Sequence, residues 1–301
     1  MNKKKPTISI VIPTYNHANF LQRALTSIVS QKYLDWEVII VDNHSDDHTD
    51  EIVNSFCNSK FKLLKIHNQG VIGVSRNRGI DCAQGEWIAF MDSDDLWYPS
   101  RLSSCSRFFE SNSENFDVIS TNEMMVFSDS NRRRILCHGP ASDHMYRDML
   151  LYGNRLSPSA TLVRREFLNQ NNLRFSVSKD FITVEDYDFW MCLAREDASF
   201  LFLNSVEGEY SIHGGNASYQ LDKHAAATEC VLRRHVFELQ SFEDNKTKLW
   251  RKVKSRIYIF DGIKRLKAFN ILKASYLIFL SILLSPFGLI LVFRKIINIR
   301  N

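Results

Sequence analysis

The first hundred residues alternate short apolar runs with segments in which apolar residues recur at helical spacing. The apolar runs cover residues 8–12, 38–41, 61–66 and 87–91. Between them, helical spacing is seen at Leu21, Ala24, Leu25 and Ile28, and again over residues 51–56 and 74–83. This alternation predicts an α/β fold with an open, mostly parallel sheet flanked by helices. Sheets of this kind bind ligands beyond the carboxyl ends of their strands.

The alternation is looser after residue 98. Pro99 is expected to be the first residue of a helix that continues through residues 101–112. Strands are expected at residues 116–120, 124–127, 160–163 and 200–203, and helices over 185–195 and 220–273. The polar stretch around Arg133 is expected to be a solvated loop.

Polar, acid-rich segments follow three of the predicted strands. One contains Pro13 and Tyr15, the second runs over residues 42–47, and the third contains Asp92, Asp94 and Asp95. Polar loops are common, so each segment alone says little, but three at one sheet edge favour a ligand site. Two carboxylates at i and i+2 can hold Mg²⁺ or Mn²⁺, which neutralises the charge of a diphosphate leaving group. We expect the 92–95 loop to be exposed to solvent.

Charge is distributed unevenly along the 301 residues. Residues 246–301 hold 13 Lys/Arg and one acid, a net charge of +12, whereas the other residues carry a net charge of −8. An acidic body with a basic tail does not fit a nucleic-acid-binding protein, whose basic patch lies on the folded domain. The six cysteines form no CxxC pair, and no secretory signal precedes the first strand, which favours a reducing cytosolic setting.

The tail combines positive charge with apolar residues. Over residues 246–273 the two kinds are interleaved, as in a helix that lies on an anionic membrane surface. Residues 274–293 are uncharged and almost wholly apolar, about the length of one membrane span, but Pro286 and Gly288 interrupt them. A single span, a dip into one leaflet and a buried soluble helix are all open. We expect the dip, with both ends on the cytoplasmic side.

Five segments in register carry a resemblance to a known family. They read SIVIPTYN (9–16), EVIIVDNHSDD (37–47), SRNRGIDCAQGEWIAFMDSDDLW (75–97), VEDYDFW (184–190) and YSIHGGNAS (210–218). Over about residues 6–220 the chain resembles the inverting family 2 glycosyltransferases of the GT-A fold. The resemblance implies a metal-dependent transfer, in one displacement, of a sugar from a nucleotide diphosphate donor to an acceptor hydroxyl.

The resemblance also implies roles for donor-site residues. Asp94 would be the main metal ligand, Asp92 would contact the ribose or the metal's waters, and His213 would be a further metal or diphosphate contact. Base and ribose would lie against Pro13, Tyr15, Asp42 and Asn43, with Arg76 near the nucleotide. Asn43 stands where a second aspartate is commoner, but its amide oxygen can still accept a hydrogen bond from the base.

Glu185 and Asp186 form the predicted catalytic pair. An acceptor hydroxyl loses its proton as it attacks, which requires a base within hydrogen-bond reach. The resemblance places the base in this pair, and we assign it to Asp186. Two acids in a first helical turn also complement the helix dipole, so both explanations stand.

Four regions follow from these features. Residues 1–98 would form the nucleotide-sugar half of the domain, 99–220 the acceptor-binding and catalytic half, 221–273 a basic helical region, and 274–301 a membrane-associated segment. The acceptor would be a lipid-linked or envelope glycan, as in bacterial lipopolysaccharide or capsule synthesis, at the cytoplasmic face of the inner membrane. A polyprenyl-phosphate sugar synthase and a non-catalytic nucleotide-binding scaffold are the alternatives.

Overall fold

The computed structural model describes residues 5–56, 58–109, 116–130, 132–214 and 220–300, the last seven of these by their backbone alone. The chain divides into two compact units. The first unit consists of Met1–Ala141, Arg155–Val177 and Glu196–Gly214, and the second of Ser142–Asn154, Ser178–Arg195 and Gly215–Asn301.

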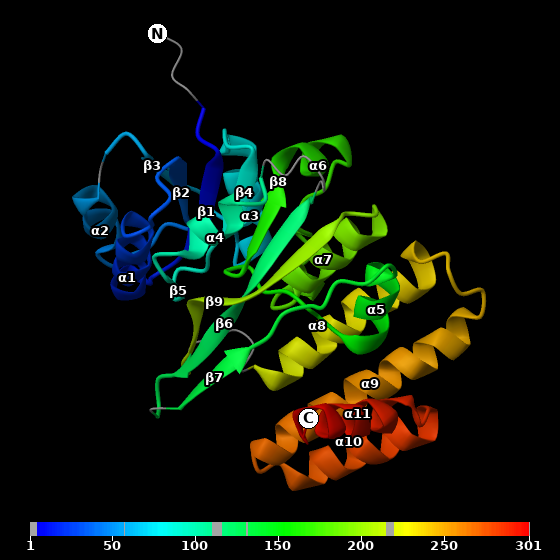
Figure 1. The fold of residues 1–301 in the computed structure, drawn as a ribbon. Helices are drawn as coiled ribbons and strands as arrows, with labels where there is room; N and C mark the ends of the chain where they lie inside the picture. The colour runs from blue at the N-terminus through cyan, green and yellow to red at the C-terminus, as the bar shows by residue number, and fades with distance from the viewer. Residues whose placement is uncertain (1–4, 57, 110–115, 131, 215–219, 301) are drawn as a thin grey trace. The chain divides into compact units, whose positions relative to one another are not determined.

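Half of the sheet in the first unit is parallel (Figure 1), in the order β3-β2-β1-β4. These are the four strands expected from the apolar runs. Their bounds are β1 (Ile8–Thr14), β2 (Trp36–Asp42), β3 (Phe61–Lys65) and β4 (Trp87–Phe90). The expected helices connect them, namely α1 (Ala18–Val29), α2 (Thr49–Ser55) and α3 (Ile72–Cys82). The prediction for this half is confirmed, except that β1 continues through Pro13 instead of ending there.

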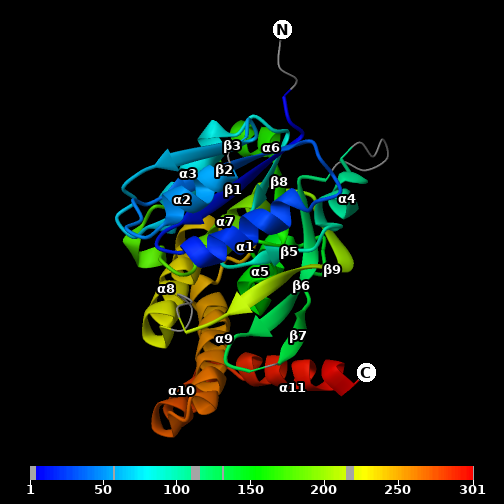
Figure 2. The ribbon, with the colours of Figure 1, turned by 90° about the vertical axis from the view of Figure 1, so that its left-hand side faces the viewer.

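Both faces of the parallel half are covered, which explains why its strands are apolar throughout. On one face, Ile10 and Ile12 of β1 belong to a buried cluster with Leu21 and Leu25 of α1. Figure 2 shows α1 lying across β1 and β2. On the other face α3 approaches β1 so closely that a Cβ on Gly79 would lie 2.2 Å from the Val11 side chain. Helix–strand packing therefore fixes the strand ends that carry the polar loops.

The second half of the sheet is mixed, so the expectation of a mostly parallel sheet is wrong there. β8 pairs antiparallel with β4 and β6, β7 with β6, and β5 with β9, whereas β6 and β9 are parallel. Parallel neighbours need a crossover connection, and a short hairpin such as β6–β7 can only be antiparallel. The strands are β5 (Leu96–Trp97), β6 (Val118–Phe127), β7 (Arg133–Leu136), β8 (Thr161–Arg164) and β9 (Phe200–Ile212).

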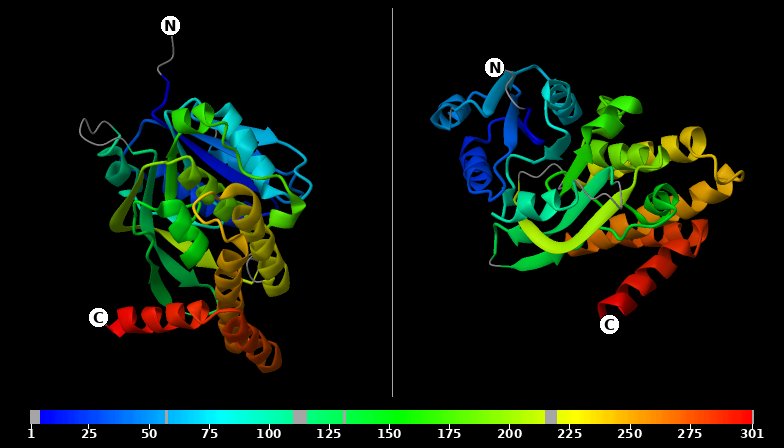
Figure 3. Two further views of the ribbon diagram at one scale, coloured as in Figure 1. Left: turned by 90° about the vertical axis from the view of Figure 1, so that its right-hand side faces the viewer. Right: turned by 45° about the horizontal axis from the view of Figure 1, so that its top comes forward.

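Three segments of this half differ from the sequence prediction. The strands expected at 116–120 and 124–127 are parts of one strand, β6, which begins at Val118, and the polar stretch with Arg133 forms β7 instead of a loop. β9 runs to Ile212, well beyond residue 203, and is strongly curved in Figure 3. The apolar signal fails for different reasons: Thr121, Asn122 and Glu123 of β6 are polar although they are buried, whereas most side chains of β7 are exposed. α4 (Arg101–Ser106) begins two residues after Pro99, and α6 (Arg165–Gln170) follows β8.

The second unit is helical in the residues that the structure describes. Its helix α7 (Glu185–Arg195) confirms the helix expected over 185–195. The other elements are α5 (Met145–Tyr152), the 3₁₀ turn η1 (Lys179–Phe181), α8 (Leu221–Arg234), the π-helical turn η3 (His235–Leu239), α9 (Lys246–Lys267), α10 (Ile271–Leu284) and α11 (Phe287–Arg300).

The basic helix α9 does not present its apolar side to a membrane surface, contrary to expectation. Leu249, Val253, Ile257 and Ile259 are buried within the protein. No single helix in the described part of the chain is long and apolar enough to cross a membrane. α10 and the first turns of α11 pass that test only together, and they are bent by 113°.

Candidate donor and metal site

The loops after β1 and β2 are joined by hydrogen bonds at the carboxyl edge of the parallel strands. Thr14 and Asp42 are register partners at the ends of the two strands. Beyond them, the Asn16 N–H donates to the Ser45 hydroxyl at 2.8 Å, and the Asn16 side-chain oxygen accepts from the Asp46 N–H at 2.8 Å. Tyr15 is 50% exposed on this joined pair of loops. The arrangement offers an aromatic ring beside a fixed polar edge.

Asp42 and Asn43 border the same edge in different ways. Asp42 is fully buried, and its carboxylate accepts from the backbone N–H and the hydroxyl of Ser45. The Asn43 side-chain oxygen accepts from the Asn68 N–H at 2.8 Å. A carbonyl oxygen has two lone pairs, so Asn43 can accept a second bond from a ligand. Asp42 therefore shapes the loop, whereas Asn43 keeps the capacity to recognise a donor group.

Arg76 and Asp92 form a partly buried ion pair. The Arg76 guanidinium comes from α3 and lies 2.7 Å from Asp92 Oδ1, in the loop after β4. The guanidinium also stacks over the Phe175 ring, 5.3 Å from its centroid. The structure thus brings together two residues that the sequence assigned to nucleotide binding.

Asp94 and His213 form the second pair of the site. His213 Nε2 lies 2.9 Å from Asp94 Oδ2, although 119 residues separate the two in the sequence. The Phe20 ring of α1 stacks on the imidazole, with centroids 4.8 Å apart and planes 17° from parallel. Phe20 therefore restrains the imidazole plane that meets Asp94. The end of the YSIHGGNAS motif, residues 215–218, lies outside the described residues.

Negative charge is concentrated around Asp94. Burial, and next the neighbouring Asp92, raise the pKa of Asp94, while the hydrogen bond from His213 opposes the shift. Burial and then the surrounding carboxylates, Asp94 first, raise the pKa of Asp95 well above its usual value. The side chain of Asp94 is only 14% exposed, so the expectation of a solvent-facing loop is wrong. A carboxylate and an imidazole, both largely buried and surrounded by further carboxylates, fit a divalent cation.

Asp95 forms hydrogen bonds to two other segments of the site. It was not assigned a role from the sequence. Its carboxylate accepts from the Ser159 hydroxyl at 2.5 Å and from the Ser211 N–H at 2.8 Å. The Ser159 oxygen in turn accepts from the Asp92 N–H at 3.0 Å. Ser211 stands two residues before His213 on the chain. Asp95 therefore links the loop that carries Asp92 and Asp94 to the segment that carries His213.

The predicted catalytic pair begins α7 in the second unit. Glu185 is buried, and its carboxylate accepts from the Thr183 N–H at 3.0 Å, across the start of the helix. Asp186 is only partly buried and meets the Asn154 amide at 3.4 Å. Glu185 therefore fits the role of an acid that complements the dipole of α7 at its first turn. The carboxylate of Asp186 is the more accessible of the two. Trp190, which follows on the same helix, is wholly buried in the core.

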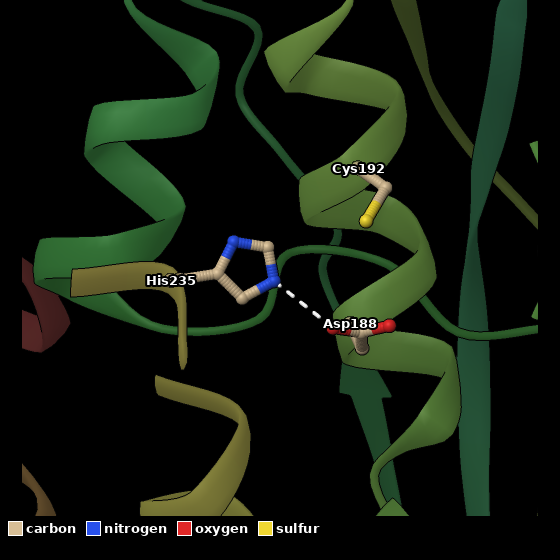
Figure 4. Close-up of side chains that lie close together, drawn as sticks. All are labelled: Asp188, Cys192 and His235. Atoms are coloured by element: carbon tan, nitrogen blue, oxygen red, sulfur yellow. Dashed lines mark hydrogen bonds and ion pairs between the residues drawn. The ribbon is translucent and has the colours of Figure 1, made fainter. Parts of the chain in front are cut away.

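A further polar cluster is formed by Asp188 and Cys192 of α7 and by His235 of η3 (Figure 4). His235 Nε2 is 3.0 Å from Asp188 Oδ1, and its Nδ1 is 3.0 Å from the Tyr146 hydroxyl. Among the residues described, Asp188, Cys192 and His235 are three ligand-type side chains whose ligand atoms lie within 4.8 Å of one another. Arg234 also binds Asp188 Oδ1 at 3.1 Å, so the single carboxylate is already neutralised. Burial lowers the pKa of His235, and we interpret the cluster as a neutral structural link between α7 and η3.

The chain is similar in sequence to known glycosyltransferases. Residues 9–170 match the model of glycosyl transferase family 2. An Escherichia coli relative, the UDP-Glc:alpha-D-GlcNAc-diphosphoundecaprenol beta-1,3-glucosyltransferase WfaP, is 28% identical over 75% of this chain and 85% of its own.

Two solved structures share the fold. Staphylococcus aureus TarS 1–349 in complex with UDP-GlcNAc aligns with a TM-score of 0.64 at 20% identity, covering 84% of this chain and 73% of that one. The mannosyltransferase PcManGT from Pyrobaculum calidifontis, in complex with GDP-Man and Mn²⁺, aligns at 0.60 and 15%, covering 99% and 81%. The family match covers more than half of the sequence, and the chain is a glycosyltransferase that belongs to glycosyl transferase family 2.

Proposed function

We propose that the protein is a metal-dependent, inverting glycosyltransferase that moves a sugar from a nucleotide diphosphate donor to a hydroxyl of a lipid-linked envelope glycan. The observation that carries the proposal is the Asp94–His213 pair beside the Arg76–Asp92 ion pair, at the carboxyl edge of the parallel strands. Carboxylate and imidazole ligands suit Mn²⁺, and carboxylates suit Mg²⁺. The Mn²⁺ bound by the archaeal mannosyltransferase supports the same choice.

The donor site separates recognition from charge neutralisation. Tyr15, Pro13 and Asn43 border the position proposed for the base and ribose, and Asp42 holds their loop. A bound Mn²⁺ or Mg²⁺, held by Asp94 and His213 with Asp92 nearby, would neutralise the charge that develops on the departing diphosphate. The Arg76 guanidinium holds Asp92 in place and would add positive charge near the diphosphate of a bound donor.

Asp186 is the proposed base. Its carboxylate would accept the proton of the attacking hydroxyl, which makes the oxygen more nucleophilic as the bond to the anomeric carbon forms. Glu185 supports it by fixing the first turn of α7 through the Thr183 N–H. Attack from the face opposite the leaving diphosphate inverts the anomeric centre, in keeping with the beta linkage named for WfaP.

The proposed acceptor and location are supported by the relative and by the tail. WfaP acts on a sugar linked to diphosphoundecaprenol, a lipid confined to a membrane. The basic residues of α9 and the apolar residues of α10 support the proposal that the enzyme acts at the cytoplasmic face of the bacterial inner membrane.

Transfer to a short polyprenyl-diphosphate sugar tests this function. The wild type should convert UDP-sugar in the presence of Mn²⁺ to a product whose new linkage is opposite in anomeric configuration to the donor, as read by NMR. Asp186→Asn should bind UDP with unchanged affinity and lose turnover by about two to four orders of magnitude. Full turnover in that variant would point to a phosphate acceptor, which needs no strong base, and retention of configuration would rule out the single displacement.

A further inference from the structure

The exposed face of α10 is mostly apolar; Ser275 interrupts it, and the exposed Lys273 near its start pairs with Asp222. The apolar side chains of this face, at helical spacing, are largely open to solvent, with exposed fractions of 88% for Leu272, 61% for Tyr276, 58% for Phe279 and 60% for Leu283. The opposite side, with Ala274, Leu277 and Ser281, is buried. Contiguous exposed apolar surface of this kind marks an interaction site.

The backbone at the break between α10 and α11 is satisfied from inside the protein. The Ser255 hydroxyl of α9 donates to the Ser285 carbonyl at 2.7 Å and accepts from the Gly288 N–H at 3.1 Å. Arg251 Nε donates to the Leu284 carbonyl at 3.1 Å. A Cβ on Gly288 would lie 2.7 Å from the Ser255 hydroxyl oxygen, so only glycine permits this contact. Irregular backbone is tolerated at membrane depth only where the protein supplies such partners.

Positive charge lies near both ends of α10. The two helices run antiparallel, because Gly262 of α9 faces Ala274 and Ile278, whereas Ser255 faces Ser281. Lys264 and Lys267 are therefore near the start of α10, and they are exposed, while Arg251 binds its last carbonyl. Basic side chains at both ends place both ends at the level of anionic headgroups.

Geometry excludes α10 from crossing a bilayer by itself. Its 14 residues span about 21 Å at about 1.5 Å per residue, against a hydrocarbon core of about 30 Å. The 113° bend then turns α11 away from the α10 direction, as Figure 3 shows. α10 therefore fits within one leaflet of a bilayer.

We infer that α10 lies in the plane of an anionic membrane, with the Leu272–Tyr276–Phe279–Leu283 face in the hydrocarbon of one leaflet and the basic residues of α9 at the headgroups. This deepens the membrane association proposed above. It makes the chain monotopic and gives it a fixed orientation toward a lipid-linked acceptor. A second copy of the chain is the competing occupant of the apolar face. The basic residues that flank the face oppose that pairing, because they would bring like charges together.

Vesicle flotation of the full-length protein, with no donor or acceptor present, tests the inference apart from the enzymatic function. The wild type should float with phosphatidylglycerol-containing vesicles and bind pure phosphatidylcholine at least tenfold more weakly. Leu272→Gln/Phe279→Gln should lose at least tenfold in vesicle affinity. Val29→Gln/Leu34→Gln, which changes two exposed apolar residues of the first unit, should bind as the wild type does. Lys264→Gln/Lys267→Gln should reduce binding to anionic vesicles alone.

Three outcomes would overturn the inference. They are wild-type protein that stays with the soluble fraction, a Leu272→Gln/Phe279→Gln variant that floats undiminished, and light scattering that shows a wild-type dimer converted to monomer by that double variant. The last outcome would assign the face to a second copy. Release of nucleoside diphosphate from the donor, measured without vesicles, would be unaffected in every case, so failure here leaves the transferase assignment standing.

Discussion

Removal of the buried Asp95 carboxylate should lower the stability of the protein and weaken metal-dependent nucleotide binding. In Asp95→Ala, the Ser211 N–H and the Ser159 hydroxyl both lose a buried acceptor. An unsatisfied buried donor costs about 1–3 kcal/mol, so two cost about 2–6 kcal/mol. Part of this is offset because the variant also removes a carboxyl whose pKa is raised well above its usual value, by burial and then by Asp94. We expect a net loss of about 2–4 kcal/mol in the free energy of unfolding.

The matched variant is Asp95→Asn. Its side-chain oxygen still accepts from the Ser211 N–H, its amide can donate to the Ser159 oxygen, and it carries no buried charge. We expect it to unfold within about 1 kcal/mol of the wild type and to keep metal-dependent nucleotide binding, whereas Asp95→Ala should lose that binding too. Urea unfolding by circular dichroism and titration calorimetry of UDP with Mn²⁺ measure the two effects. Equal stability of Asp95→Ala and wild type, or equal damage in both variants, would refute the linking role.

Three further outcomes are expected. Phe20→Leu should weaken Mn²⁺-dependent UDP binding about two- to tenfold in calorimetry, since an aromatic stack contributes about 0.5–1.5 kcal/mol. Phe20→Tyr keeps the aromatic ring and should bind as the wild type does. Equal binding by the wild type and both variants would contradict the restraint on His213. Ser255→Ala should lower the unfolding free energy by about 1–3 kcal/mol by leaving the Ser285 carbonyl and the Gly288 N–H without their partner, and an unchanged urea midpoint would contradict it. Burial, and next Lys264, lower the pKa of His224 from 6.5 to about 4. The contribution of His224 to the free energy of unfolding is therefore present above pH 6.5 and lost as the pH falls toward 4, a loss of at most about 3 kcal/mol at about 1.4 kcal/mol per pKa unit. His224→Gln should accordingly show a flatter dependence of the unfolding free energy on pH.

The sequence predicts the parallel half of the sheet because both faces of its strands are buried. Ile10 and Ile12 meet α1 while Val11 meets α3, so every position is apolar and the strands stand out from the helices between them. β7 carries no such signal, since Arg133 and its neighbours are exposed and only the backbone pairs. β9 is missed beyond residue 203 because most of its side chains there are only half-buried and the buried Glu207 is polar.

The sequence supplies the candidate residues of the site, but not the way in which they pair. The position of Asp92 and Asp94 after an apolar strand is a local feature, whereas the Arg76–Asp92 and Asp94–His213 pairs depend on how distant segments meet. Asp95 looked like a third surface acid because burial of a carboxyl group cannot be read from neighbours along the chain. The His235–Asp188 link was missed likewise, since 47 residues separate its members.

The metal dependence of donor turnover tests the central claim most directly. Release of nucleoside diphosphate from a UDP- or GDP-sugar should require Mn²⁺ or Mg²⁺, stop when a chelator is added and resume when the metal is restored. Asp94→Asn, which keeps the size of the side chain and removes its charge, should abolish release at every metal concentration while the protein remains folded by circular dichroism. Turnover that continues at the wild-type rate in the chelator, or in Asp94→Asn, would contradict the account.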